Sequence, residues 1–334
     1  MDMYAMLRLY QELPRITVIV DVAMRLVNYS RVLWPFAHST VFMLRDMRLF
    51  LEALEYFDER IQYKKQERGN LIGLLLCCIS ILLILAEFAL APVYFRRYPE
   101  NTRVLQWILS VVIRGLESLV LLQITTLVLE LRERFRILND CILTTATPHS
   151  NKHISRILLG YVRQPDLATQ LGVVRLQHAH AVLQRAAEIL QRHFDITLVL
   201  HVTTALSALI YGAYEFLVMC MAPEKSHATV VNNSKASAAT WLTSHILNLV
   251  AVVLSCSATV DEAERTRDLV VRVATLQGRP FLSAGMEPLL TQVLNSRPLS
   301  FEAAGFFTID RHLLVSALCV TITYLVILAQ ISLS

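Results

Sequence analysis

Charge and glycine are both scarce in this chain of 334 residues. Asp, Glu, Lys and Arg make up 17% of it, against about 25% in a soluble domain, and the mean hydropathy is +0.49. This composition excludes a soluble globular domain and a disordered chain, and a net charge of only +4 without a basic run excludes a nucleic-acid-binding protein. With 9 glycines and no alternating apolar pattern, a membrane β-barrel is excluded too. An all-α integral membrane protein remains.

The motifs of catalysis and cofactor binding are also missing. The chain contains no G-x-x-x-x-G-K-[ST], G-x-G-x-x-G, H-E-x-x-H or G-x-S-x-G sequence. Its 6 cysteines include no two in one predicted extracellular loop, so we expect no disulfide. We therefore expect no enzyme, no cofactor and no metal site.

Long apolar runs, by contrast, are abundant. A membrane-spanning helix needs roughly 20 mostly apolar residues, and residues 71–95, 104–130, 196–222, 239–260 and 313–334 satisfy this requirement. A sixth segment, residues 16–44, is weaker because it carries three charged residues and a proline. It is either a tilted or protein-buried span, which we favour, or an amphipathic helix on the membrane surface. The sequence thus predicts a multi-span helical bundle.

The distribution of basic residues orients the spans. Lys and Arg gather in cytoplasmic loops. Residues 45–70, 131–195 and 261–312 carry 21 of them, whereas residues 96–103 and 223–238 carry 5. The first set is therefore expected inside and the second outside, which leaves the C-terminus extracellular. Asn232, in the sequence Asn-Asn-Ser, is a candidate glycosylation site in a loop expected outside.

This orientation divides the chain into six regions. They are residues 1–70 (a weak span, 16–44, and a cytosolic helix), 71–130 (two spans), 131–195 (a cytosolic helical loop), 196–260 (two spans), 261–312 (a cytosolic helical segment) and 313–334 (the last span). The cytosolic regions have apolar residues at helical spacing, for example Met47, Phe50, Leu51, Leu54 and Phe57. They predict either simple extensions of the membrane helices or a packed cytosolic layer, and both can be true.

Ionisable and aromatic residues gather in the outer halves of the predicted spans. Charges inside a membrane usually face protein or water, so they mark a candidate ligand site. Its predicted residues are Glu87, Trp107, Arg114, Tyr211, Tyr214, Glu215, Trp241 and His245. Glu117 lies near mid-depth and His201 in an inner half. The alternative is structural: ion pairs between helices and an interfacial aromatic belt.

The last predicted span carries a polar stripe on an apolar helix. Ser316, Thr323 and Gln330 are seven residues apart and share one face, with Val320 and Ile327 between them. In a symmetric oligomer, these five residues would line a pore. Packing of small polar residues between helices is the alternative. Tyr324 lies about a quarter-turn away, and we expect it to pack against a neighbouring helix.

The same helix carries a family resemblance. Thr323-Tyr324, five apolar residues and Gln330 resemble the C-terminal signature of insect gustatory receptors, with Ile331 in place of a Phe. The preceding residues 305–310, with the sequence GFFTID, and the helical segment 173–195 resemble the corresponding parts of the family. The resemblance implies seven spans with a cytosolic N-terminus, of which the first is expected to be missing here. It also implies similarity to the insect odorant receptors, which are tetrameric ligand-gated cation channels with a central pore formed by the last helix.

These observations together predict a taste receptor in the plasma membrane. It would be a non-selective cation channel subunit that binds a small-molecule tastant and forms a homo- or hetero-tetramer with other receptors of the family. One rival is a seven-helix G-protein-coupled receptor, which needs the reverse orientation. The other is a small-molecule transporter, which would show repeats with Gly/Pro-broken helices.

Overall fold

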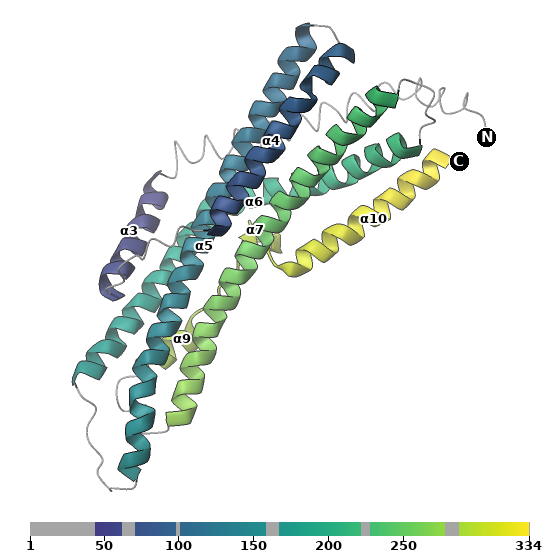
Figure 1. The fold of residues 1–334 in the computed structure, drawn as a ribbon. Coiled ribbons are helices and arrows are strands. Elements are labelled where there is room, and N and C mark those ends of the chain that lie inside the picture. Colours follow the sequence, from purple (N-terminus) through teal and green to yellow (C-terminus); the bar gives the residue numbers. More distant parts are fainter. Residues whose placement is uncertain are drawn as a thin grey trace.

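The computed structural model describes residues 44–61, 71–97, 101–157, 167–221, 228–277 and 287–333. Nearly all of them are helical, which confirms the expected all-α membrane fold (Figure 1). The helices are α3 (Leu44–Ile61), α4 (Leu71–Arg97), α5 (Asn101–Ile157), α6 (Leu167–Met221), α7 (Ala228–Gln277), α9 (Glu287–Asn295) and α10 (Arg311–Leu333). The weak span predicted at 16–44 lies outside the described residues, except for Leu44.

Four described helical stretches are long and apolar enough to cross a membrane. They are Val111–Thr144, Gly172–Tyr214, Ala239–Thr275 and Arg311–Leu328, and each overlaps a span predicted from the sequence. The remaining predicted span, residues 71–95, falls within α4, whose described side chains give a shorter apolar stretch, Leu74–Ala86. All five predicted runs are thus helical in the structure.

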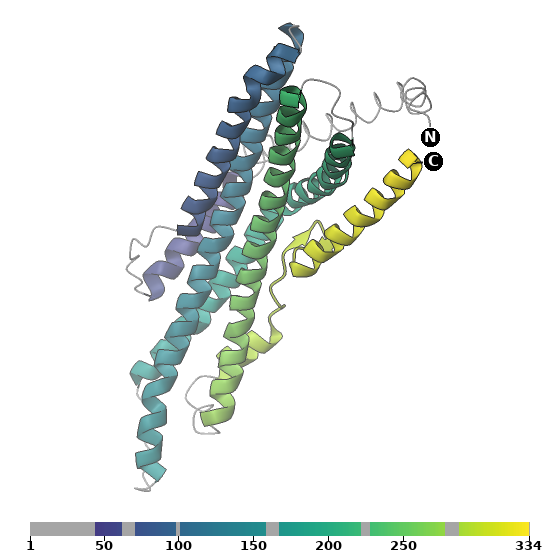
Figure 2. The same cartoon turned by 45° about the vertical axis from the view of Figure 1, so that its right-hand side comes forward.

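The central helices are far longer than a bilayer is thick. Helix α5 has 57 residues and α6 has 55, so each reaches over 80 Å at about 1.5 Å per residue, against about 30 Å of hydrocarbon. Figures 1 and 2 show α5, α6 and α7 as long rods that continue well beyond α4. The expected cytosolic loop at 131–195 is therefore largely the continuation of α5 and the beginning of α6. Helix α7 likewise begins at Ala228, within a stretch predicted as an outer loop.

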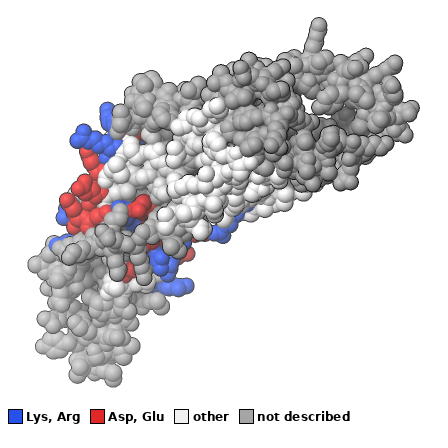
Figure 3. All heavy atoms as spheres, turned by 45° about the horizontal axis from the view of Figure 1, so that its top comes forward, with Lys and Arg blue, Asp and Glu red and all other residues white. Residues whose placement is uncertain are grey.

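Charged side chains gather at one end of the described surface, whereas uncharged surface occupies its middle (Figure 3). Polar contacts also join the helices to one another. Arg134 of α5 donates to Asp58 of α3 at 2.8 Å and to Glu130 at 2.7 Å, and buried Asn139 donates to the Glu262 carboxylate of α7 at 2.8 Å. The predicted helix extensions thus also pack together as one layer.

The amphipathic pattern in α3 largely identifies its buried face. Phe50, Leu54 and Phe57 are buried against α6, and Met47 packs on the edge of this core. Leu51 is the exception, because 52% of it is exposed. Its position is one residue after Phe50, which places its side chain about 100° around the helix from that face.

A small hairpin that the sequence analysis did not predict precedes α10. Its strands β1 (Glu302–Ala303) and β2 (Phe307–Thr308) pair antiparallel. In the three-residue loop between them, Ala304 and Gly305 have positive φ, 47° and 75°, and the Phe306 amide donates to the Ala303 carbonyl at 2.9 Å, which closes a tight turn. Asp310 then caps α10 by accepting the Leu313 amide at 3.1 Å. Two-residue strands are too short to produce a readable alternating pattern.

One glutamine of α6 anchors this hairpin. The Gln191 side chain donates to the Glu302 carbonyl at 2.5 Å and accepts from the Glu302 amide at 3.1 Å, so it pairs with β1 as a further strand would. Gln184 donates to the Arg297 carbonyl at 2.8 Å on the same side of α6. At the other side of the junction, Arg311 of α10 pairs with Asp261 of α7 at 2.5 Å. The start of α10 is therefore fixed to both α6 and α7.

Candidate functional site

Two predicted ligand-site residues on α7 contact each other, and one of them packs against α6. The rings of Trp241 and His245 meet edge to face, with centroids 4.8 Å apart and planes at 75°. His245 is 3% exposed. The Trp241 indole occupies the space beside Gly212 of α6, where an added Cβ would lie 2.6 Å from Trp241 Cζ3. The two helices approach closely here because Gly212 has no side chain.

The predicted tyrosines flank that glycine. Tyr211 is 48% exposed and Tyr214 is half-buried. The two tyrosines are three residues apart and so share one side of α6, whereas Gly212 lies on another side of the same turn. Arg114, on α5, is also half-buried. The structure thus brings Trp241 and His245 to the α6 turn that carries both tyrosines. Aromatic rings beside a buried histidine can bind a small molecule by stacking and by hydrogen bonds.

Gly212 itself was not singled out in the sequence. A signal for it was present, because glycine is rare in this chain and this one stands between two tyrosines in the sequence YGAY. A glycine inside a helix costs about 1 kcal/mol relative to alanine, so such a position often has a packing reason.

A contact between two ionisable side chains joins α5 and α6. His201 Nδ1 is 3.8 Å from Glu117 Oε1, and the two side chains are 1% and 5% exposed. Both residues were predicted as intramembrane groups, but their contact was not predicted. Because each is enclosed by protein, this contact joins two membrane helices and does not open to lipid.

Some predicted site residues cannot be placed at the level of their side chains. Helices α4, α5, α6 and α7 include the positions of Glu87, Trp107, Glu215 and Asn232, respectively, but these side chains lie outside the described residues. Their predicted roles stay predictions.

The predicted pore stripe lies on the uncovered surface of α10. Ser316, Val320, Thr323, Ile327 and Gln330 are all exposed. The covered side is marked by Ala317 and Thr321, 4% and 7% exposed, where α10 packs against α6 and α7. Tyr324 is 51% exposed, so a helix that packs against it has to come from elsewhere than the described part of this chain.

Among the four described stretches that are long and apolar enough to cross a membrane, the one in α10 is the least covered. In its most apolar stretch 11% of the residues are buried, against 33–44% in the other three. Figures 1 and 2 show it diverging from the α5–α7 bundle beyond the hairpin. A single protomer therefore leaves the face of this helix opposite Ala317 and Thr321 available to lipid or to other subunits.

Comparisons with known proteins agree with this architecture. The family model described as 7tm chemosensory receptor matches residues 2–334. The chain is similar to the insect olfactory receptor OR5 from Machilis hrabei in complex with eugenol, with a TM-score of 0.65 and 14% identity over 92% of this chain and 81% of that one. A second structure of the insect olfactory receptor OR5 from Machilis hrabei gives the same TM-score and identity, over 92% of this chain and 80% of that one. No curated protein matches the chain in sequence.

Proposed function

The chain belongs to the 7tm chemosensory receptor family, and from this we propose that it is a taste receptor: a subunit of a ligand-gated, non-selective cation channel. The observation that carries the channel proposal is the last helix. It is apolar, almost uncovered in the protomer, and bears the stripe of Ser316, Thr323 and Gln330. The proposal of taste rather than smell rests on the C-terminal Thr-Tyr…Gln signature.

A fourfold assembly gives this stripe a function. Rings of hydroxyl and amide groups can hydrogen-bond a partly hydrated ion without holding it tightly, which suits weakly selective cation flow. Val320 and Ile327, on the same exposed face, would form hydrophobic constrictions that gate by dewetting. The partners are accordingly other copies of this chain or related receptors.

The ligand site in this proposal is the aromatic cluster between α6 and α7, together with Arg114, Glu87, Trp107 and Glu215. Glu87 and Glu215 carry carboxylates, against the single arginine, Arg114. A third carboxylate, Glu117, is three residues after Arg114 in the sequence. An acidic excess with aromatic walls favours small molecules that carry a protonated amine.

The channel proposal predicts a specific effect at Gln330. Cells that express the chain should give ligand-evoked cation currents that persist when G-proteins are blocked. Gln330→Ala should change single-channel conductance or ion selectivity, because it removes the amide ring, while surface delivery stays normal. Whole-cell and single-channel recordings with surface biotinylation measure both quantities.

Tyr324→Ala is the matched variant for that experiment. Tyr324 lies off the stripe, so its substitution should reduce assembly rather than alter permeation.

Currents that vanish when G-proteins are blocked would favour a G-protein-coupled receptor, and ligand uptake without current would favour a transporter. Unchanged permeation in Gln330→Ala would mean that the stripe faces a helix.

The orientation is tested separately. We expect the C-terminus to be extracellular because 21 basic residues lie in the segments assigned inside and 5 in those assigned outside. An epitope tag after Ser334 should therefore stain on intact cells. A tag after Ile61, in the segment assigned inside, serves as the control and should stain only after permeabilisation. Staining with the opposite pattern would contradict both the orientation and the channel proposal.

A further inference from the structure

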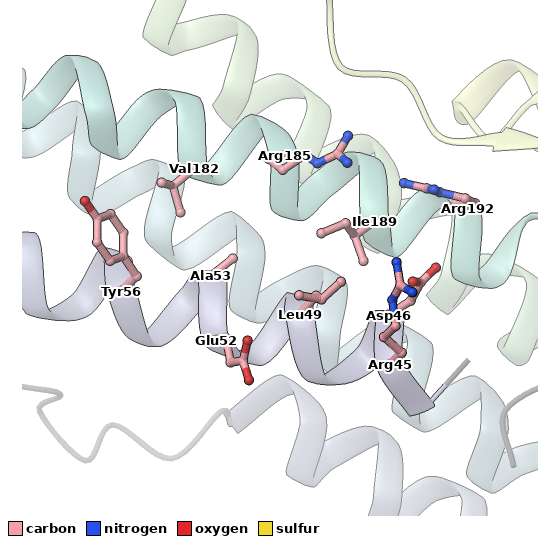
Figure 4. A pocket seen from close by; sticks show the side chains of 10 residues that line it. All are labelled: Arg45, Asp46, Leu49, Glu52, Ala53, Tyr56, Val182, Arg185, Ile189 and Arg192. Atoms are coloured by element: carbon pink, nitrogen blue, oxygen red, sulfur yellow. The ribbon is translucent and has the colours of Figure 1, made fainter. Parts of the chain in front are cut away.

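A groove between α3 and α6 has the features of an anion site. Its volume is about 420 Å³, within the range of small-molecule pockets. Leu49, Val182 and Ile189 form apolar walls, and Arg45, Arg185 and Arg192 line it as well. Figure 4 shows the Arg185 and Arg192 side chains extending toward one another along α6, with Arg45 and Asp46 on α3 close to Arg192.

The charges in and around the groove leave a basic excess at one end. Glu52 lines the groove but accepts from Arg48 at 2.9 Å, and Arg185 pairs with Glu188, also at 2.9 Å. Near Arg192, the remaining charged groups that line the groove are Arg45 and Asp46. Two arginines therefore face one carboxylate at this end, and Arg185 carries a third guanidinium two turns away.

The basic end is also the end nearest the membrane. The predicted span begins at residue 196, so Arg192 lies about 6 Å before it along α6 and Arg185 about 16 Å before it. The headgroup layer is roughly 5 to 8 Å thick on each side of the hydrocarbon. Arg192 and Arg45 thus lie at the depth of lipid phosphates, and Arg185 lies just beyond them.

We propose that this groove binds a phosphoinositide of the inner leaflet. The inference rests on the proposed orientation, which places α3 on the cytosolic side. Basic pockets beside membrane helices on the cytoplasmic side suit such headgroups. The Arg185 and Arg192 side chains extend toward one another, and Arg45 lies close to Arg192, so three guanidinium groups line one groove (Figure 4). An inositol ring that carries several phosphates can engage more than one of these groups at once, which favours a phosphoinositide over phosphatidylserine.

The same geometry predicts effects of opposite sign for two kinds of substitution. Arg45→Gln and Arg192→Gln each remove a basic group near the phosphate, and each should weaken lipid binding about fivefold. Asp46→Asn removes the nearby carboxylate and should strengthen binding by a similar factor. Arg136→Gln is the matched control, because Arg136 is an exposed arginine of α5 outside the groove.

Native mass spectrometry of the purified full-length chain tests this directly. Phosphatidylinositol 4,5-bisphosphate should be retained at least tenfold better than phosphatidylcholine and clearly better than phosphatidylserine. A gain for Asp46→Asn together with losses for both arginine variants would support the site, since misfolding cannot produce a gain.

Three results would overturn it. They are equal retention of all lipids, a loss in Arg136→Gln as large as in Arg192→Gln, and equally tight binding of soluble inositol 1,4,5-trisphosphate, which would identify a free polyphosphate as the ligand. Lipid retention that is insensitive to every variant would overturn it as well. The measurement involves no current, so it can succeed or fail independently of the channel proposal.

Discussion

Replacing His201 with alanine should reduce the yield of folded receptor by more than tenfold. His201 and Glu117 are 3.8 Å apart and almost fully buried between α5 and α6. Removing one partner of a buried pair typically costs about 3 to 5 kcal/mol, because the other polar group keeps its desolvation cost. Folded proteins have only about 5 to 15 kcal/mol of stability, so this loss is large. Fluorescence-detected size-exclusion chromatography and surface biotinylation measure the yield.

A double substitution distinguishes the loss of the polar contact from the loss of side-chain volume. Replacing both Glu117 and His201 with leucine removes both polar groups, and such apolar replacement is often neutral or stabilising. The double variant should therefore recover most of the yield lost in His201→Ala. His178→Ala is the control on the same helix, because His178 is exposed, and it should behave as the unchanged receptor. A yield of the double variant no higher than that of His201→Ala would show that the two residues act independently.

The pair illustrates what the sequence could and could not predict. Hydropathy placed both residues in membrane helices, since apolar runs of about 20 residues identify spans directly. It could not pair them, because the contact depends on how α5 and α6 are rotated against each other. Residues 84 positions apart carry no local signal of such a rotation.

Other features of the fold also separate into those that the sequence predicted and those that depend on tertiary contacts. Helical periodicity predicted the buried face of α3 through Phe50, Leu54 and Phe57, because one face of an amphipathic helix packs against its neighbour. The hairpin before α10 was missed because each strand has two residues. The two hydrogen bonds between the Gln191 side chain and the Glu302 backbone were not predicted, because glutamine on a helix is usually a surface residue. Only the tertiary structure brings the Glu302 backbone to it.

Gly212→Ala should impair the ligand response strongly while leaving the receptor at the cell surface. The added Cβ would lie 2.6 Å from Trp241 Cζ3 and 3.1 Å from Cε3, so the indole or the helix has to move. Overpacking of this kind costs about 1 to 3 kcal/mol, which corresponds to roughly 5- to 150-fold in an equilibrium. We therefore expect at least about a fivefold rise in the half-maximal ligand concentration, measured from dose–response currents. Gly172→Ala, on the same helix with nothing within 4 Å of its added Cβ, should respond normally.

A compensating change distinguishes the close approach from a weakened helix. Alanine favours a helix over glycine by about 1 kcal/mol, so Gly212→Ala cannot act by destabilising α6 itself. If it acts by displacing the indole, then a smaller ring should restore the space, and Gly212→Ala combined with Trp241→Phe should recover much of the ligand sensitivity. If Trp241 instead contacts the ligand directly, the combination should be worse than either single variant. A normal response in Gly212→Ala alone would mean that the α6–α7 contact at this level does not shape the ligand site.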